Sequence, residues 1–145
     1  MSLFATLSIA GSGMSAESER LSATASNIAN ANSAVGAGGQ PYRAREVVFQ
    51  AASIAEGDDD GGSGDEASSA SMDGVRVAGV VESDAPTHTV YDPSSTFADA
   101  NGYVQMPNVS PVDEMVNMIS AQQDYQANLE AFNVAKSLAL RTLSI

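Results

Sequence analysis

The sequence predicts a mainly α-helical protein in which a small β module is inserted between two long terminal helices. Three observations predict this fold: a 3-4 spacing of stripe positions near the N-terminus, the same spacing near the C-terminus, and short strand-like segments between them. A stripe with this spacing covers one side of a helix, and over several heptads it is typical of a coiled coil. We therefore expect the terminal helices to pack together as a coiled-coil pair.

The N-terminal helix is expected over about residues 3–31. Its stripe begins at Phe4, and Leu7, Met14, Leu21 and Ile28 then recur at one heptad position, with smaller residues mostly at the other. At 1.5 Å per residue such a helix extends roughly 45 Å, longer than a compact domain of this size requires. This length favours a helix that packs along other helices.

Three asparagines crowd the end of this helix, in the segment ASNIANAN at residues 25–32. Asparagine is a mediocre helix former, but its amide donates and accepts hydrogen bonds without a charge to desolvate. We expect Asn27 and Asn30 to bond to neighbouring backbone or side chains on a face covered by other helices, and Asn32 to end the helix. The alternative is that all three mark a fraying helix end.

The C-terminal helix is expected to begin at Ser110-Pro111, a capping serine followed by proline in the first turn. Asp113 and Glu114 then lie where the helix dipole favours acid, and basic residues lie near its other end. Its stripe positions are Met115, Met118, Gln122, Tyr125, Leu129, Phe132, Lys136, Ala139 and Leu143. The Ala-, Ser-, Asn- and Gln-rich surfaces beside both stripes suit close packing against further helices.

The stripes define a candidate assembly interface. Its members are Phe4, Leu7, Met14, Leu21, Asn27, Ile28, Asn30, Met115, Met118, Gln122, Tyr125, Leu129, Phe132 and Leu143. The methionines have two interpretations, since helical spacing alone makes them core fillers, while soft side chains also fit several different neighbours.

The middle of the chain reads as strands and turns. Residues 42–49 and 74–82 have strand composition, residues 86–93 read as irregular, and Asn101-Gly102 predicts a turn before a strand at 103–106. Residues 57–71, GDDDGGSGDEASSAS, predict a disordered acidic loop. We divide the chain into a helical assembly domain, residues 1–35 with 108–145, and a β-rich or irregular module, residues 36–107.

Composition excludes several classes of function. The net charge of −12 argues against a nucleic-acid partner, and seven of the eighteen acidic residues lie between Glu56 and Asp73. The absence of cysteine excludes disulfides and thiolate metal sites. No apolar run is long enough to span a membrane. No basic residue precedes Arg20, so we expect no cleaved secretory signal; the chain stays in the cytoplasm or leaves by a route that does not read one.

The residues offer no convincing active site. His88 is the only histidine and has no supporting motif, so we interpret it as a loop residue. The acidic residues at 58–60 and 65–66 do not have the spacing of an EF-hand, although a calcium role is a remote alternative. Residues 61–64 lack the lysine of a phosphate-binding loop. We expect no enzyme activity, no cofactor and no metal.

Several segments resemble bacterial flagellar rod and hook proteins, and are most similar to the proximal-rod members of that family. The longest is ASNIANANSAVGAGGQPYRAREVVF, residues 25–49, and others are residues 90–93, NGYVQMPNV at 101–109, EMVNMISA at 114–121, YQAN at 125–128 and FNVAK at 132–136. The acidic segment 57–71 departs from the family pattern.

The resemblance implies a structural subunit whose terminal helices pack as a coiled coil in the inner tube of the flagellar axial structure. It implies export by the flagellar type III pathway without a cleaved signal, and a place in the basal-body rod, the drive shaft across the periplasm. The implied partners are the rod proteins FlgB, FlgF and FlgG-like subunits, the adaptor FliE, and the MS ring with the export gate. The residues alone also allow a soluble helical adaptor or export chaperone that grips one partner helix.

Overall fold

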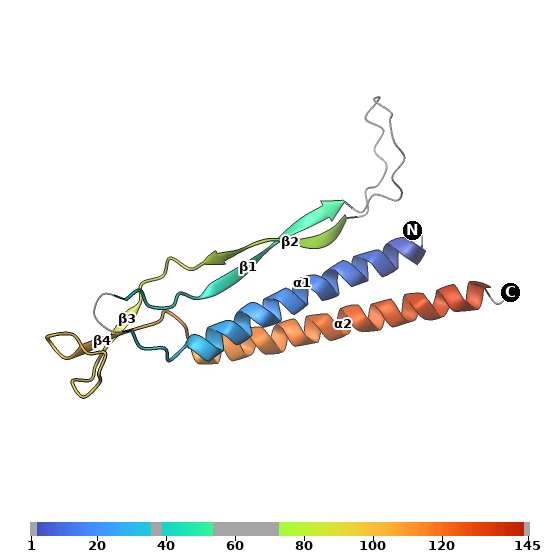
Figure 1. Cartoon of the computed structure of the whole chain (residues 1–145). Helices are drawn as coiled ribbons and strands as arrows, with labels where there is room; N and C mark the ends of the chain where they lie inside the picture. The colour runs from blue at the N-terminus through green and yellow to red at the C-terminus, as the bar shows by residue number, and fades with distance from the viewer. Residues whose placement is uncertain (1–2, 36–38, 54–72, 144–145) are drawn as a thin grey trace, which may run out of the picture.

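Two long antiparallel helices dominate the computed structural model, which describes residues 3–35, 39–53 and 73–143. Helix α1 covers Leu3–Asn30 and helix α2 covers Pro111–Leu143. They lie side by side, so both ends of the chain are at the same end of an elongated molecule (Figure 1). The expected helices at 3–31 and from Pro111 are confirmed; in α2 the amide of Glu114 donates to the carbonyl oxygen of Ser110, at 3.0 Å.

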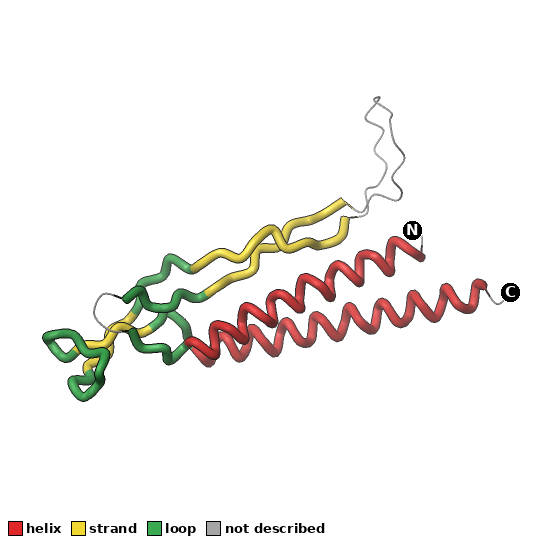
Figure 2. Tube along the Cα trace, in the orientation of Figure 1, coloured by secondary structure: helices red, strands yellow, loops and turns green. Residues whose placement is uncertain are grey.

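A β-hairpin runs along α1 on the side away from α2 (Figure 2). Strand β1, Arg45–Ser53, pairs antiparallel with β2, Asp73–Glu82, and a bulge falls between Val48 and Phe49. The Ser12 hydroxyl on α1 accepts a hydrogen bond from the amide of Val75 at 3.1 Å. Helix α1 therefore lies between two neighbours, α2 and the hairpin.

A second, smaller sheet lies beyond the end of the helix pair at which α1 ends and α2 begins (Figure 1). Strand β3, His88–Tyr91, pairs antiparallel with β4, Tyr103–Met106, and the rings of Tyr91 and Tyr103 meet edge to face at 5.3 Å. Gly102 has a φ of 83°, as the predicted Asn-Gly turn requires, and a Cβ there would lie 2.9 Å from the Tyr91 ring.

Two sequence-based boundaries differ from the structure. Residues 88–91 form a strand rather than irregular chain, because their backbone pairs with β4 although prolines flank the segment. Strand β1 begins at Arg45 rather than residue 42, because Tyr42 turns toward the end of α1. Strands at 74–82 and 103–106 are confirmed. The predicted acidic loop at 57–71 lies outside the described residues.

The core of the chain is built from small side chains. Its buried apolar residues are mostly alanines, including Ala10, Ala16, Ala121 and Ala135. The largest fully buried side chains are Asn27 and Pro107, and a small cluster joins Ala31, Ala44 and Val109 beside Tyr42. Within the described residues, the chain thus buries little of its large apolar surface against itself.

Candidate assembly surfaces and the junction that holds them

Asn27 is the centre of the junction between the helices and the hairpin. Its side chain is 1% exposed. The Nδ2 group donates to the Arg45 carbonyl oxygen at 2.9 Å and to Glu114 Oε2 at 3.0 Å. Oδ1 accepts from the Tyr42 hydroxyl at 2.9 Å and from the Arg45 amide at 2.8 Å. All four hydrogen-bonding positions of the amide are filled, which no other short neutral side chain could do.

A second asparagine fixes the same junction from the far side. Asn108 Oδ1 accepts from the Ala44 amide at 2.8 Å, and its Nδ2 donates to the Ala85 carbonyl oxygen at 2.9 Å. Consecutive amides, at Ala44 and Arg45, are thus held by two different asparagines. The direction in which β1 leaves the helix pair is set by these bonds.

The expectation that Asn27 bonds to neighbouring groups on a covered face is confirmed, but a helix is only one of its two neighbours. Asn27 is covered by the start of β1 as well as by α2, not by helices alone. Asn30 bonds locally: its Nδ2 donates to the Ser26 carbonyl oxygen of its own helix at 2.8 Å. Helix α1 ends at Asn30, two residues before Asn32.

The two helices approach each other through small and polar side chains. Apart from Ser120, the residues of α2 with reduced exposure recur every three and four positions: Pro111, Glu114, Met118, Ala121, Tyr125, Asn128, Phe132, Ala135 and Ala139. Gly13 lies so close to α2 that a Cβ on it would be 2.8 Å from Asn128 Nδ2. Arg20 pairs with Asp124 across the helices at 3.6 Å and with Glu17 at 3.4 Å.

This seam corrects one part of the predicted stripe. Of the predicted positions, Met118, Tyr125 and Phe132 face the seam, whereas Met115 and Leu129 are exposed by 53% and 40%. The other heptad position of the seam lies one residue before the predicted Gln122 and Lys136. Ala121 and Ala135 occupy it, and their small side chains permit close approach.

The structure separates the predicted interface residues into groups. Asn27 is buried. The half-buried members are Leu7, Met14, Leu21, Ile28, Asn30, Met118, Tyr125 and Phe132. The exposed members are Phe4, Met115, Gln122 and Leu129. The side chain of Leu143 lies outside the described residues.

Large apolar side chains remain exposed along most of α2. Val112, Met115, Val116 and Ile119 form a ridge on its first turns, with exposures of 71, 53, 62 and 56%. Val134, Leu138 and Leu140 are exposed further along the helix, and Phe4 of α1 is 77% exposed. Contiguous apolar surface of this kind on a small chain indicates contacts with other proteins.

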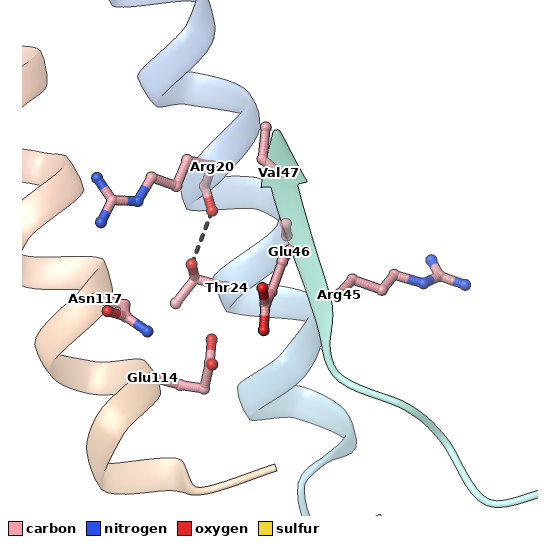
Figure 3. A pocket seen from close by; sticks show the side chains of 8 residues that line it. Arg20, Thr24, Arg45, Glu46, Val47, Glu114 and Asn117 are labelled. Atoms are coloured by element: carbon pink, nitrogen blue, oxygen red, sulfur yellow. Dashed lines mark hydrogen bonds between the residues drawn. The ribbon is translucent and has the colours of Figure 1, made fainter. Parts of the chain in front are cut away.

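A polar pocket of about 240 Å³ lies where α1, α2 and β1 meet. Figure 3 shows the Glu46, Glu114 and Asn117 side chains around it, with the Arg45 side chain directed away. The Thr24 hydroxyl donates to the Arg20 carbonyl oxygen at 2.8 Å. The residues lining the pocket include no histidine, serine or cysteine, so they do not form a catalytic triad.

The described part of the chain contains no cluster of three metal-ligating side chains. None of its helices is long and apolar enough to cross a membrane. His88 is exposed on β3.

A polar, hydrogen-bonded junction and extensive exposed apolar helix surface are features of a structural subunit that assembles with other chains. Comparison with known proteins agrees with this class. Residues 7–37 match the family model for flagella basal body rod proteins, and residues 100–145 match the model for the C-terminal part of the flagellar basal body rod FlgEFG proteins.

Curated relatives match over the full chain. The FlgC flagellar basal-body rod proteins of Salmonella typhimurium and Escherichia coli O157:H7 are 49% and 48% identical, and the alignments cover 100% of this chain and 98% of each relative. The FlgC protein of Bacillus subtilis is 33% identical, covering 100% of this chain and 99% of the relative. The chain belongs to the FlgC family of flagellar basal-body rod proteins. It is a structural rod subunit of the flagellar basal body, not an enzyme, and it assembles with other rod proteins.

Sequence reasoning missed the residues that bring the helices together. The Ala-, Ser-, Asn- and Gln-rich surfaces beside the stripes were assigned to further helices, not to the contact between α1 and α2. The residues of that contact which the prediction leaves out are Gly13, Ala121, Asn128 and Ala135. A search for small residues at heptad spacing would have found Ala121 and Ala135, which lie seven residues before and seven residues after Asn128. Asn108 could not have been found this way, because its partners are distant in the sequence.

Proposed function

We propose that the chain polymerises through its terminal helices into the proximal part of the rod, which transmits torque across the periplasm. The observation that carries this proposal is the apolar surface left exposed on α2 by a chain whose own core is largely alanine. Burial of apolar area drives association at roughly 25 cal/mol per Å², so these side chains gain most when neighbouring subunits cover them. In the assembled rod we expect α1 and α2 to pair as a coiled coil.

The same proposal names the partners and the division of labour. FlgB, FlgF and FlgG-like subunits would be the helical neighbours, with FliE, the MS ring and the export gate at the base of the rod. The match of residues 100–145 to a model named for FlgE, FlgF and FlgG supports this, because chains with similar α2 helices can pack by similar contacts. The helical segments 1–35 and 108–145 would form the assembly domain, and residues 36–107 a module beside it.

We also propose that the flagellar type III apparatus exports the chain without cleaving a signal. Membership of the flagellar rod protein family supports this route. Mass spectrometry of the chain recovered from basal bodies tests it. Loss of an N-terminal segment of signal-peptide length would contradict it.

Charge substitutions on the predicted interface test assembly. Leu21→Asp and Phe132→Asp each place a charge on a half-buried apolar position, at a cost of several kcal/mol. We expect both variants to abolish swimming and to be missing from isolated basal bodies. Ser22→Asp and Asn133→Asp, at exposed positions next to each site, are the matched controls and should swim.

The outcome that would overturn the proposal is normal swimming in both Leu21→Asp and Phe132→Asp. Immunoblots of whole cells should show each variant at the level of its control. A variant that accumulates but does not enter basal bodies has lost assembly rather than expression.

A further inference from the structure

The connection between β3 and β4 contains the only Asn-Gly pair of the chain, Asn101–Gly102. The Asn101 side chain is exposed. Asparagine followed by glycine is the pair at which a side-chain amide reacts most readily with the backbone, because glycine has no Cβ to hinder the approach of its nitrogen. This position therefore combines the most reactive local sequence with access to water.

Deamidation of such a pair proceeds through a five-membered ring. The backbone nitrogen of Gly102 loses its proton and bonds to Cγ of Asn101, and the bond from Cγ to Nδ2 breaks, so that the side-chain nitrogen leaves as ammonia. Water then opens the ring: its oxygen adds to one of the two ring carbonyl carbons, and a proton returns to the nitrogen. The product is aspartate when the bond from Cγ to the nitrogen breaks, and isoaspartate when the original backbone bond breaks.

The fold cannot lower this reactivity by placing a bulkier residue after Asn101. Gly102 has a φ of 83°, and a Cβ on it would lie 2.9 Å from the Tyr91 ring and 3.2 Å from Cβ of Pro93. The backbone conformation and the close contact both require glycine. Protection of Asn101 must therefore come from the hydrogen bonds around the turn.

Asp99 holds the turn through both its backbone and its side chain. Its carbonyl oxygen accepts from the Gly102 amide at 3.0 Å, and its own amide donates to the Tyr103 carbonyl oxygen at 2.8 Å. Its Oδ1 accepts from the Asn101 amide at 2.8 Å and from the Tyr103 amide at 2.9 Å. Three consecutive amides, at residues 101–103, are thus bonded to one residue.

These bonds oppose ring closure in two ways. The attacking atom is the Gly102 nitrogen, and its N–H is already donated to Asp99, while the Gly102 carbonyl oxygen accepts from the Asp92 amide at 3.0 Å. Gly102 must therefore break hydrogen bonds before its nitrogen can turn toward Cγ of Asn101. The reactive form of that nitrogen is an anion, and the nearby Asp99 carboxylate disfavours a second negative charge.

We propose that Asn101 is a latent deamidation site, which Asp99 keeps in the amide form while the turn is folded. The inference is independent of the proposed rod function. Residues 84–106 contain no lysine or arginine and three acidic side chains, Asp84, Asp92 and Asp99. Conversion of Asn101 to aspartate adds a negative charge to this acidic part of the chain. Isoaspartate also inserts a methylene group into the backbone, so the bonds of the turn no longer fit.

The rate of deamidation in the full-length chain tests this inference. Mass spectrometry of peptides, after incubation at mildly alkaline pH, separates Asn101 from its aspartate and isoaspartate products. We expect the wild-type chain to react at least about tenfold more slowly in native buffer than in concentrated guanidinium, because reaction in the folded chain waits for local opening. Asp99→Ala removes two side-chain hydrogen bonds, each of which changes the population of the open turn roughly fivefold. In native buffer we expect this variant to react at least about fivefold faster than the wild type.

Asp92→Ala is the matched control. It also removes a carboxylate from this connection, but the described hydrogen bonds of that carboxylate come from Ser94. Its rate should equal that of the wild type. The inference is overturned if the wild-type chain reacts equally fast folded and unfolded, if Asp99→Ala reacts no faster than the wild type, or if Asp92→Ala reacts as fast as Asp99→Ala.

The comparison of the folded and unfolded wild-type chain involves no substitution. It decides whether the fold protects Asn101 even where Asp99→Ala loosens the pairing of β3 with β4. Swimming and entry into basal bodies are separate measurements, so an unprotected Asn101 would leave the rod function standing.

Discussion

Replacing Asn27 should destabilise the chain far more than replacing Asn30, although the two asparagines lie one turn apart. Asn27→Ala removes four hydrogen bonds of 2.8 to 3.0 Å. It leaves the Arg45 amide and carbonyl groups without their Asn27 partners at a part-buried position, while the Tyr42 hydroxyl keeps its contact with Ser26 Oγ at 3.1 Å. Asn30→Ala removes only bonds to its own helix end.

The magnitude follows from the number of bonds lost. A neutral hydrogen bond contributes about 1 kcal/mol and a bond to a charged group about 1.5–3 kcal/mol. The three bonds whose partners are left without a replacement, two to the Arg45 backbone and one to the Glu114 carboxylate, together contribute about 4 kcal/mol. The better helix propensity of alanine offsets about 0.6 kcal/mol of this loss. We expect a net loss of about 3 kcal/mol, or roughly 10 °C in Tm for a chain of this length. For Asn30→Ala we expect less than about 1 kcal/mol.

Asn27→Asp adds a dependence on pH. The new oxygen would face the Arg45 carbonyl and Glu114, so burial and repulsion raise the pKa of the introduced carboxyl above its usual value. A raised carboxyl pKa means that the folded state holds its proton when the unfolded state has lost it. Stability therefore falls as the pH rises from about 4, the unfolded value, and recovers on acidification.

Guanidinium unfolding, followed by circular dichroism at pH 4.5 and pH 8, measures all three variants. Asn27→Asp should be less stable than Asn27→Ala at pH 8, and the difference should narrow at pH 4.5. The reasoning is refuted if Asn27→Ala and Asn30→Ala unfold at the same denaturant concentration, or if Asn27→Asp matches the wild type at pH 8.

Two further predictions concern the glycines of α1 and the acidic segment. Gly11→Ala should stabilise the chain by up to about 1 kcal/mol, because nothing lies within 4 Å of the added Cβ. In the same denaturation assay Gly13→Ala should gain less stability or lose it, because the Asn128 side chain must move. Equal gains in the two variants would contradict the close approach of the helices. Replacing residues 57–71 with a short Gly-Ser link should leave swimming in soft agar intact, because the segment contains no large apolar residue; loss of rods would instead make it a contact surface.

The sequence predicted the helices well because their signals are local. Proline in the first turn, the following acids and the long 3-4 spacing all act within a few residues, and the observed start of α2 at Pro111 agrees with them. The strand at 74–82 was similarly predicted by its own composition, and it pairs with β1. The strand at 88–91 was not predicted, because it forms by pairing with β4, which lies further along the chain.

The observed seam between α1 and α2 differs from the predicted stripe because hydrophobic periodicity does not say which neighbour covers a residue. Met115 and Leu129 look like seam residues by their chemistry, but within this chain they are exposed. The α1–α2 contact instead selects Ala121 and Ala135, with exposures of 0% and 3%, because close helix approach needs small side chains. An apolar stripe on an assembling protein predicts the sum of its contacts, inside the chain and with other subunits.

These two sets of contacts divide the work of the molecule. Hydrogen bonds are directional, so the junction at Asn27 and Asn108 fixes how the hairpin leaves the helix pair without requiring a large apolar core. Apolar burial is non-directional and grows with area, so it suits a contact that must form repeatedly between subunits. A core filled with the methionine, valine and isoleucine side chains of α2 would stabilise the monomer but remove the surface that we propose for assembly. The chain instead orients its parts with polar bonds and leaves these large apolar side chains exposed.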